Sequence, residues 1–438
     1  MQAISLKASR EQGPANPFPS QAGGGKRSVS SNPALAQLAK SKKVLLLQGP
    51  LGSFYDRLTC WLQTGGAEVH RVALQGGDEH DCQLLKPIAY RGTLQDWPAF
   101  LQTLMARLDI DCVVMFGQSR HYHAKARAVA RERDLPVVVL EEGYFRPGFM
   151  TMELGGVNGY STTLQRYAWK PMALVKGDAS GLLPLKGIAP HLSRRHFQKM
   201  AWQAACHYIA MHLSRADYPH YVHHRHDDPY HYLGYWFHSW RRKLMARASD
   251  YRFQARLFKS TRPYFFVPLQ HDADAQITHH SPFSENTDFI IRVLRSFAAH
   301  APAEAWLVLR QHPQSRGGAG HMGLIFSLAT ELGVHHRVHH LVEGDTPDIA
   351  QRAAGVVLIN STVGLQALER GAPLMALGDA LYKQPNLTFS GDLDAFWKQA
   401  RPADKATTAA FLAQMKNLTQ ASVSLYALRD EPIPWRHL

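Results

Sequence analysis

Residues 112–143 read CVVMFGQSRHYHAKARAVARERDLPVVVLEEG, and this stretch decides the fold class. An apolar run at 112–116 is followed by a stretch at about 121–133 that we expect to be helical, and then by a second apolar run at 137–140. Short apolar runs without alternation are typical of parallel strands that are buried on both faces. A strand, a helix and another strand in this order predict the β-α-β unit of a doubly wound sheet.

The same order of elements recurs along most of the chain, which predicts an α/β architecture. At 438 residues the chain is long enough for two domains, each with its own core. We therefore expect a Rossmann-like domain at 42–185 and a second one at 263–400. The further strands that the sequence predicts lie at 44–47, 68–72, 264–269, 305–310, 338–342, 355–359 and 373–377. The further helices are expected near 54–65, 95–108, 287–299, 322–332 and 363–371.

Three segments fall outside this order. Residues 1–41 are rich in Ser, Gly, Pro, Ala and Gln and lack a periodic apolar face, which predicts a disordered leader. Residues 186–262 are aromatic, basic and histidine-rich, and we expect a mostly helical connector there. Residues 401–438 are expected to hold a helix that packs back on the first domain.

The formal net charge is +14 without counting any of the 25 histidines, which implies anionic partners such as nucleic acid, acidic lipid or an acidic sugar nucleotide. Nucleic acid is the least favoured, because the sequence has no helix-turn-helix, zinc-finger or RNP-type motif. No apolar run approaches the roughly 18–20 residues that cross a bilayer, and the N-terminus lacks the hydrophobic segment of a signal peptide. The four cysteines form no CxxC pair, which is typical of a reducing compartment. We therefore expect a cytoplasmic protein.

Polar clusters directly follow four of the predicted strands. In open α/β sheets, ligands bind outside the carboxyl ends of the strands. Because the clusters are divided between the two predicted domains, we expect them to line one shared cleft. The clusters are Glu141-Glu142-Gly143, the segment from Gln270 to Asp274, His312-Pro313, and Asn360-Ser361-Thr362.

The carboxylates predict acid–base chemistry. Glu141 and Glu142 are adjacent at the end of an apolar strand, so partial burial and mutual repulsion are expected to raise the pKa of one of them. A general acid or base needs that property, although a solvated turn with a capping role explains the pair as well. The 270–274 segment adds an acidic group on the other domain, and opposed carboxylates suit retaining glycosyl transfer. A surface turn stays open for Asp272.

Two further clusters suit a phosphate. Proline restricts the residue before it to an extended backbone, so His312 before Pro313 is held where it can donate a hydrogen bond. Asn360-Ser361-Thr362 precedes a predicted helix. The free backbone N–H groups at the start of that helix, with the hydroxyls of Ser361 and Thr362, are expected to bind a phosphate. The alternative is that this segment only caps the helix. The histidines and aspartates at 220–231 match no standard zinc spacing, and a basic, aromatic surface for lipid or acceptor explains them as well as a metal does.

Several motifs occur in order along roughly residues 43–425. They are Leu46-Leu47-Gln48-Gly49-Pro50, Glu141-Glu142-Gly143-Tyr144-Phe145-Arg146-Pro147, Gly155-Gly156-Val157-Asn158-Gly159, Val267-Pro268-Leu269-Gln270, Asp274, Gln311-His312-Pro313, Asn360-Ser361-Thr362-Val363-Gly364-Leu365 and Gly391-Asp392-Leu393-Asp394-Ala395-Phe396-Trp397. At these motifs the sequence resembles the KpsS/LipB-type capsule polysaccharide proteins of Gram-negative bacteria, which are relatives of the KpsC modules. Related modules often have Glu-Asp-Gly where this chain has Glu-Glu-Gly, and Arg310 stands where a lysine is common.

The resemblance implies a GT-B fold and a retaining β-Kdo transferase that uses CMP-β-Kdo as donor substrate and needs no cofactor or metal. It implies a phosphatidylglycerol-type lipid as acceptor, which receives the first Kdo of the capsule linker. The implied partners are a KpsC-like transferase and other capsule assembly proteins. The implied location is the cytoplasmic surface of the inner membrane of a Gram-negative bacterium, where the protein is peripheral.

The resemblance also implies roles for individual residues. Asp274 is expected to be the nucleophile, and one of Glu141 and Glu142 the acid/base. Arg310 or Arg146 is expected to neutralise the carboxylate or phosphate of the donor. The residues expected to bind the donor are Arg310, His312, Pro313, Asn360, Ser361 and Thr362. Further cleft residues are expected at Gln48, Gly49, Gly143, Arg146, Asn158 and Gln270.

Two alternatives stay open. A non-catalytic capsule export or lipid-binding accessory would keep the fold without needing the carboxylates, and the intact acidic set argues against it. A related transferase with another CMP-sugar, such as CMP-sialic acid, is not separated from a Kdo enzyme by motif spacing, because both donors carry a carboxylate at the anomeric carbon.

Overall fold

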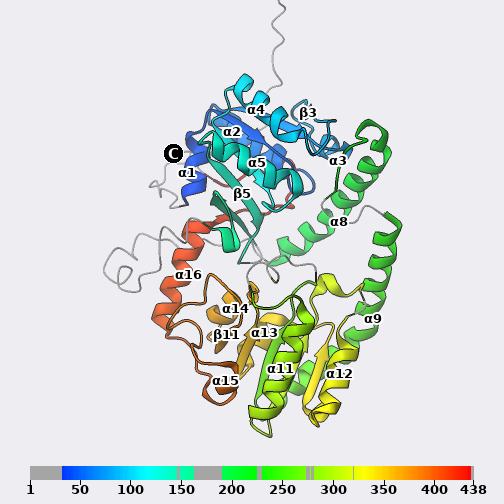
Figure 1. Cartoon of the computed structure of the whole chain (residues 1–438), viewed down its shortest axis with the longest axis vertical. Coiled ribbons are helices and arrows are strands. Elements are labelled where there is room, and N and C mark those ends of the chain that lie inside the picture. Colours follow the sequence, from blue (N-terminus) through cyan, green and yellow to red (C-terminus); the bar gives the residue numbers. More distant parts are fainter. Residues whose placement is uncertain are drawn as a thin grey trace, which may run out of the picture.

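The protein is built on two sheets that lie at opposite ends of its long axis (Figure 1). The computed structural model describes residues 32–145, 148–161, 190–223, 229–272, 277, 281–318 and 320–435. Within these residues the first sheet comes from the N-terminal part of the chain, together with one strand from the C-terminal end. The second sheet comes from the part between them.

The first sheet has seven strands in the order β12-β6-β5-β4-β1-β2-β3. Neighbours from β5 to β3 are parallel, whereas β6 pairs antiparallel with both β5 and β12. The central strands β1 and β4 and the first four residues of β5 are largely apolar and buried on both faces, as their sequences predict. The strands are β1 (Lys43–Leu46), β2 (Glu68–Ala73), β3 (Ile88–Ala89), β4 (Cys112–Phe116), β5 (Val137–Glu142), β6 (Phe149–Leu154) and β12 (Gln420–Ser422).

The second sheet has five parallel strands in the order β11-β10-β7-β8-β9. Its strands lie close to the positions that the apolar runs predict. They are β7 (Tyr264–Pro268), β8 (Trp306–Arg310), β9 (Val338–Leu341), β10 (Gly355–Leu358) and β11 (Leu374–Ala376).

The parallel strands of both sheets share one topology. In each sheet they follow the order third, second, first, fourth, fifth, so the order reverses between β1 and β4 and between β7 and β10. The connections leave these neighbouring strands toward opposite faces, which opens a crevice at their carboxyl ends. Two Rossmann-like units of this kind confirm the expected GT-B fold class.

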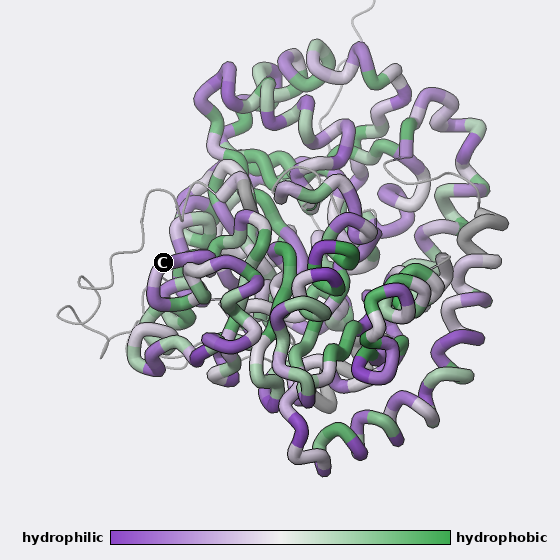
Figure 2. Tube along the Cα trace, turned by 60° about the horizontal axis from the view of Figure 1, so that its bottom comes forward, coloured by the Kyte–Doolittle hydropathy of each residue, from purple (hydrophilic) through white to green (hydrophobic). Residues whose placement is uncertain are grey.

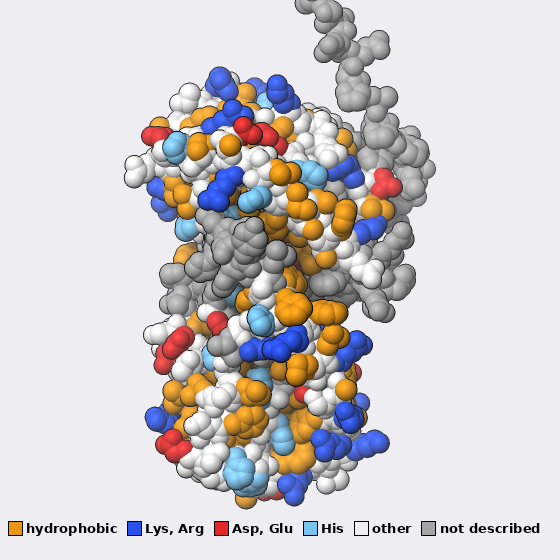
Figure 3. Space-filling view, turned by 90° about the vertical axis from the view of Figure 1, so that its right-hand side faces the viewer, with side chains coloured by type: hydrophobic (Ala, Val, Ile, Leu, Met, Phe, Trp, Pro, Cys, Tyr) orange, Lys and Arg blue, Asp and Glu red, His pale blue; other side chains and the backbone are white. Residues whose placement is uncertain are grey.

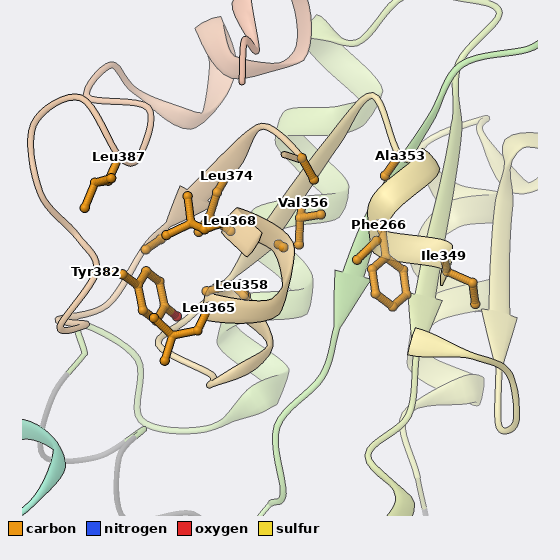
Figure 4. Close-up of a cluster of buried hydrophobic side chains, with 14 of the residues drawn as sticks. Phe266, Ile349, Ala353, Val356, Leu358, Leu365, Leu368, Leu374, Tyr382 and Leu387 are labelled. Atoms are coloured by element: carbon orange, nitrogen blue, oxygen red, sulfur yellow. The ribbon is translucent and has the colours of Figure 1, made fainter. Parts of the chain in front are cut away.

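Each sheet carries a hydrophobic cluster on each of its faces. Figure 4 shows one cluster of the second sheet, where Phe266 lies beside Ile349 and where Leu358, Leu365 and Tyr382 pack together. Complete burial of such a side chain contributes about 1.5–3 kcal/mol. Figure 2 shows hydrophobic residues concentrated along the central strands and hydrophilic ones along the outer helices and loops. The helices that accompany the sheets are α2 (Phe54–Thr64), α3 (Gly76–His80), α4 (Trp97–Leu108), α5 (His121–Glu132), α11 (Asn286–His300), α12 (Met322–Glu331), α13 (Thr346–Arg352), α14 (Val363–Glu369) and α15 (Leu393–Gln399).

A short helix, α1 (Pro33–Lys40), precedes the first strand. The expectation of a disordered leader up to residue 41 is therefore wrong for residues 33–40, and the leader's first 31 residues lie outside the described part of the chain. Ala34, Leu35 and Leu38 are buried in the core of the first sheet. Asn32 caps the helix by accepting hydrogen bonds from two backbone N–H groups. Three buried apolar residues are enough to anchor so short a helix, and they are too few to form a recognisable helical period in the sequence.

The C-terminal part of the chain returns from the second sheet to the first. Helix α16 (Lys405–Thr419) runs alongside both sheets in Figure 1 and buries Phe411, Leu412 and Met415 in a cluster of the second sheet. The same cluster contains Tyr144 and Phe145 from the first unit. Directly after α16, β12 adds an edge strand to the first sheet by pairing with β6. The tail thus holds the expected helix, but the apolar residues of that helix lie in a cluster of the second sheet, and β12 is the part that joins the first sheet.

Two long helices connect the units on the other side, α8 (Pro190–Leu213) and α9 (Pro229–Lys259) (Figure 1). Helix α8 packs on α3, where a Cβ at Gly77 would lie 2.6 Å from the carbonyl oxygen of His207. Helix α9 packs on the second unit, where the Asp250 carboxylate accepts hydrogen bonds of 2.9 Å from the backbone N–H groups of Val342 and Glu343.

The contact between α3 and α8 generates a stability prediction. Gly77→Ala places a methyl group against the backbone of α8, so we expect a lower unfolding free energy by about 1–3 kcal/mol. Gly323→Ala in α12 is the control, because its new Cβ meets nothing within 4 Å. Urea unfolding followed by circular dichroism measures both variants. Equal midpoints for the two variants would contradict the tight packing of α3 on α8.

Candidate functional site

Three of the polar residues predicted from the sequence lie at the switch points of the two sheets. Gln48 follows β1 in the first sheet, and Gln270 follows β7 in the second. Asn360 follows β10, the strand beside β7. Since a crevice opens at the carboxyl ends of these strand pairs, these residues occupy the places where α/β proteins bind ligands.

Gln270 and Asn360 form a reciprocal amide pair across the second switch point. The Gln270 side chain donates to Asn360 Oδ1 at 2.9 Å, and the Asn360 backbone N–H donates to Gln270 Oε1 at 3.1 Å. Asn286 at the start of α11 donates to the Gln270 carbonyl at 2.9 Å. Because Gln270 is buried, these hydrogen bonds fix the first residues after β7 and β10 relative to each other.

Asp272 is held firmly at this edge. Its Oδ1 accepts hydrogen bonds of 2.8 Å from the Asn286 amide and from His321 Nε2. Burial by itself raises the pKa of the Asp272 carboxyl, but the hydrogen bonds from His321 and Asn286 outweigh burial and lower the pKa overall. Asp272 is therefore an anchored carboxylate. Asp274, the expected nucleophile, lies outside the described residues, as does Arg146.

His312 has the extended backbone that Pro313 was expected to impose, with φ −63° and ψ 136°. Its Nδ1 accepts a hydrogen bond of 3.2 Å from the Gln314 backbone N–H. A neutral imidazole that accepts at Nδ1 carries its proton on Nε2. The ring also packs edge-to-face on His271, with 5.9 Å between centroids. His312 thus carries its proton on Nε2, directly beyond the end of β8.

Arg310 is the last residue of β8 and is mostly buried. Burial lowers the pKa of its guanidinium, and so does the nearby positive charge of Arg316, whereas Glu343 opposes the shift. Arg310 Nε has no hydrogen-bond partner among the described residues. A partly buried cation with an unsatisfied N–H is suited to an anionic ligand, because guanidinium groups bind phosphate and carboxylate through two parallel hydrogen bonds.

The turn at Asn360-Ser361-Thr362 differs from the expected phosphate cradle. The backbone N–H of Val363 donates to Ser361 Oγ, and those of Gly364 and Leu365 donate to the carbonyls of Ser361 and Thr362. The first N–H groups of α14 are therefore used within the turn, and the expectation that they are free is wrong. The Ser361 and Thr362 side chains remain as the polar groups of this turn that a phosphate could reach.

Gln48 is the centre of a buried network at the first switch point. Its amide donates to the Asp78 carboxylate at 3.2 Å and to the Tyr221 hydroxyl at 3.1 Å. Arg120 donates to Gln48 Oε1 at 3.1 Å and to the Gly49 carbonyl at 3.3 Å. A Cβ at Gly49 would lie 2.7 Å from the ring of a neighbouring tyrosine, so only glycine fits. Tyr221 comes from the connector, which thus lies against this switch point.

The two glutamates lie within β5 and not in a loop after it. Adjacent residues of a strand point to opposite faces, so the expected repulsion between the Glu141 and Glu142 side chains is wrong. Glu141 Oε2 accepts a hydrogen bond of 3.0 Å from the Asn158 side chain. Glu142 Oε1 accepts one from the Tyr426 hydroxyl of the C-terminal tail. At Gly143 a Cβ would clash with the Phe149 carbonyl, which explains the glycine where β5 turns into β6.

Sequence reasoning missed Glu153 on β6, which is fully buried beside Glu141. Its two oxygens accept hydrogen bonds from the hydroxyls of Tyr144 and Ser161. Burial raises the pKa of Glu153 to about 8, the two hydrogen bonds oppose the shift, and the charge of Glu141 adds to it. Glu153 is thus a carboxyl with a raised pKa on the strand next to the glutamate pair. A single acid inside the apolar segment 149–154 was the signal that could have revealed it.

A hollow of about 400 Å³ lies elsewhere, and Thr93, Lys125 and His220 are among its lining residues. It contains none of the predicted site residues and has no charged cluster, so we place the candidate site at the switch points. In the part of the chain that the structure describes, no group of three or more His, Cys, Asp or Glu side chains is placed to hold a metal ion. No helix of that part is long and apolar enough to cross a membrane.

The structure brings predicted residues together in three groups, each within one sheet: Gln48 with Gly49, Glu141 with Asn158, and Gln270 with Asn360. Together with two Rossmann-like units and polar switch points, they define a two-domain α/β protein of GT-B type.

The chain belongs to the capsule polysaccharide biosynthesis protein family, which matches residues 111–426. It is 31% identical over 397 residues to the capsule polysaccharide export protein KpsS of Escherichia coli, covering 90% of this chain and 99% of KpsS. It is 32% identical over 409 residues to the capsule polysaccharide modification protein LipB of Neisseria meningitidis serogroup A, covering 92% of this chain and 96% of LipB.

Two solved structures that resemble the chain have lower sequence identity. The β-Kdo 2,7 transferase of Thermosulfurimonas dismutans KpsC is 14% identical, covers 88% of this chain and 93% of its own, and has a TM-score of 0.42. The UDP-GlcNAc 2-epimerase of Neisseria meningitidis bound to UDP-GlcNAc is 12% identical, covers 85% of this chain and 98% of its own, and has a TM-score of 0.33.

Glu153 generates a pH prediction. Its pKa is about 8 in the folded protein and roughly 4.3 in an unfolded chain. Its contribution to stability is therefore complete below about pH 4.3 and is lost progressively as the pH rises to about 8, because over that range unfolding releases the proton. This group alone should lower the unfolding free energy by on the order of 4 kcal/mol between pH 5 and pH 9. Urea unfolding at both pH values should show the loss in the wild type and much less of it in Glu153→Gln. Parallel pH curves for the two proteins would rule out the raised pKa.

Proposed function

We propose that the protein is a retaining β-Kdo glycosyltransferase of capsule polysaccharide biosynthesis. It would use CMP-β-Kdo as donor and place Kdo on a phosphatidylglycerol-type lipid. The observation that carries the proposal is the placement of polar clusters at the carboxyl ends of parallel strands, at the switch points of both sheets, in a member of the capsule polysaccharide biosynthesis family. Membership of this family, with KpsS and LipB as relatives, supports a role with an acidic capsule sugar.

The second unit supplies groups suited to the donor. CMP-Kdo carries a phosphate and a carboxylate, both of which are anionic. Arg310 offers its charge and an unsatisfied N–H, His312 offers its Nε2–H, and Thr362 offers a hydroxyl. Hydrogen bonds between ionised partners contribute roughly 1.5–3 kcal/mol each. The positive charge of the guanidinium and a hydrogen bond from the imidazole also stabilise CMP as a leaving group.

Retention requires two displacements. In the first, the Asp274 carboxylate attacks the anomeric carbon, and the bond from that carbon to the phosphate oxygen breaks, so that CMP leaves with the electron pair. In the second, a hydroxyl of the lipid acceptor attacks the same carbon. The Asp274 carboxylate then leaves with its electron pair, and a glutamate of β5 accepts the hydroxyl proton.

We assign the proton transfer to Glu141. Asn158, from the motif 155–159, donates to its carboxylate, and the loop around Asn158 is itself fixed, because Gln118 makes two hydrogen bonds to Val157. Glu142 instead bonds to Tyr426 of the C-terminal tail. Glu142 thus has a structural partner, whereas Glu141 belongs to a preorganised polar group.

Release of CMP from CMP-Kdo with a phosphatidylglycerol acceptor tests these roles. We expect Asp274→Ala to lower kcat at least about 1,000-fold and Glu141→Gln to lower it about 100- to 10,000-fold. Glu142→Gln is the matched control and should retain activity within about tenfold of the wild type. Full activity of Asp274→Ala would exclude the nucleophile, and a reversed order of the two glutamine variants would exclude Glu141.

The same assay separates the alternatives. Faster turnover of CMP-sialic acid than of CMP-Kdo would assign the other donor. Calorimetry in which the wild type binds no CMP would support a non-catalytic accessory. Replacement of His312 by Ala should weaken CMP binding about 10- to 100-fold, because one charge-assisted hydrogen bond is lost.

We also propose that the protein is peripheral on an anionic membrane surface, with α9 as the contact. Phe237, Trp240 and Leu244 are spaced i, i+3 and i+7 on the outward side of α9, with 63%, 61% and 49% of their surfaces exposed. Basic residues flank them, and the one acidic residue of α9, Asp250, bonds to the second unit. Figure 3 shows this side of the molecule, where hydrophobic and basic side chains lie side by side. Such a face suits the headgroup region of anionic lipids.

Vesicle sedimentation tests this surface. The double variant Phe237→Ser/Trp240→Ser should bind phosphatidylglycerol-containing vesicles at least about tenfold more weakly than the wild type, because it lacks two aromatic side chains that become buried in the lipid headgroup region on binding. Met322→Ser/Phe326→Ser on α12 is the control, since it removes two exposed apolar residues from a helix without this charge pattern. An equal loss of vesicle binding in both variants would exclude the α9 surface as the membrane contact. Equal binding of the wild type to neutral and anionic vesicles would exclude it as well.

A further inference from the structure

A buried chain of hydrogen bonds links Glu153 to the proposed proton acceptor. Glu153 Oε1 accepts from the Tyr144 hydroxyl at 3.0 Å. The same hydroxyl accepts from the Asn158 backbone N–H at 2.8 Å. The Asn158 side chain then donates to Glu141 Oε2 at 3.0 Å. Three consecutive hydrogen bonds therefore connect a carboxyl with no exposed surface to a carboxylate at the end of β5.

The residue in the middle of this chain is held in an uncommon conformation. Asn158 has φ +54°, in the left-handed region that non-glycine residues seldom adopt. The preceding loop is fixed by Gln118, which donates to the Val157 carbonyl and accepts from its N–H, and by Arg127, which donates to the Gly155 carbonyl. Because strained residues persist only when their surroundings hold them, this loop is built to keep Asn158 in one orientation.

Among the described residues, the ionisable groups that influence the pKa of Glu153 are Tyr144 and Glu141, and Ser161 adds a hydroxyl. Burial raises the pKa of Tyr144 well above its ordinary value, so its hydroxyl keeps its proton. That proton is the one donated to Glu153, and the Tyr144 oxygen stays available to accept from Asn158. Ionised Glu153 would add a second negative charge in the same buried region as Glu141.

We propose that Glu153 is a positioning residue that stays protonated and, through Tyr144 and Asn158, sets the orientation and charge environment of Glu141. Only the effect of Glu153 on proton transfer by Glu141 rests on the proposed function. The hydrogen-bond chain and its response to pH are properties of the protein itself. Loss of the proton from Glu153 places a negative charge beside the Tyr144 hydroxyl, and the resulting change in hydrogen bonding passes to the Asn158 N–H that this hydroxyl accepts from.

Nuclear magnetic resonance of protein labelled with ¹⁵N-asparagine tests the chain without any substrate. In the wild type, the backbone and side-chain N–H signals of Asn158 should shift together as the pH rises from 6 to 10, with a midpoint near 8. In Glu153→Gln both signals should stay constant over this range. In Tyr144→Phe the backbone N–H loses its acceptor, so its signal should lose the pH response. Signals that do not titrate in the wild type, or that titrate equally in Glu153→Gln, would overturn the inference.

Kinetics test the consequence for Glu141. Glu153→Ala should lower kcat at least tenfold with KM for CMP-Kdo within about threefold, because donor binding is left intact while Glu141 loses its orientation. Glu153→Gln should restore most of the rate at pH 7 and remove the change of rate that the wild type shows near pH 8. If Glu153 had a merely structural role, both variants would have a similarly lowered kcat and the pH profile would be unchanged. That result would overturn the proposal. If the wild type transfers no sugar, the proposed function fails, and the asparagine signals still decide the inference.

Discussion

The reversal of strand order beside the first strand of each sheet is the constraint on which the rest of the structure depends. It sends the connections after β1 and β4, and after β7 and β10, toward opposite faces. The carboxyl ends of these strands are therefore left uncovered by their own helices. Polar side chains that are hydrogen-bonded to one another line the two crevices. Gln48 and Arg120 do so in the first sheet, and Gln270 and Asn360 do so in the second.

The fold was largely predictable because parallel strands buried on both faces appear as short apolar runs. The antiparallel edge was not, since β6 and β12 are far apart in the sequence and nothing local marks Gln420 as the partner of Thr151. The same edge explains the error at the glutamate pair. Once β6 pairs with β5, Glu141 and Glu142 belong to a strand and point to opposite faces. Helix α1 was missed because its apolar face is only three residues long.

The candidate site was predictable as a set of positions and not as a set of contacts. Polar residues after apolar strands located Gln270, His312 and Asn360 without a structure. Their partners come from distant segments, and Glu153 is recognisable only when Tyr144 and Ser161 are seen around it. Glu153 also shows how burial separates two carboxyls of one sheet. One is enclosed and keeps its proton, while the other lies at a strand end and has an amide donor.

A crystal structure of the protein with CMP tests the central claim most directly, that the switch points form the donor site. The account predicts CMP at the carboxyl end of the second sheet, with its phosphate within hydrogen-bonding distance of His312 Nε2 and the Arg310 guanidinium. CMP bound anywhere else, for example in the hollow beside Lys125 and His220, with His312 and Arg310 untouched, would contradict it.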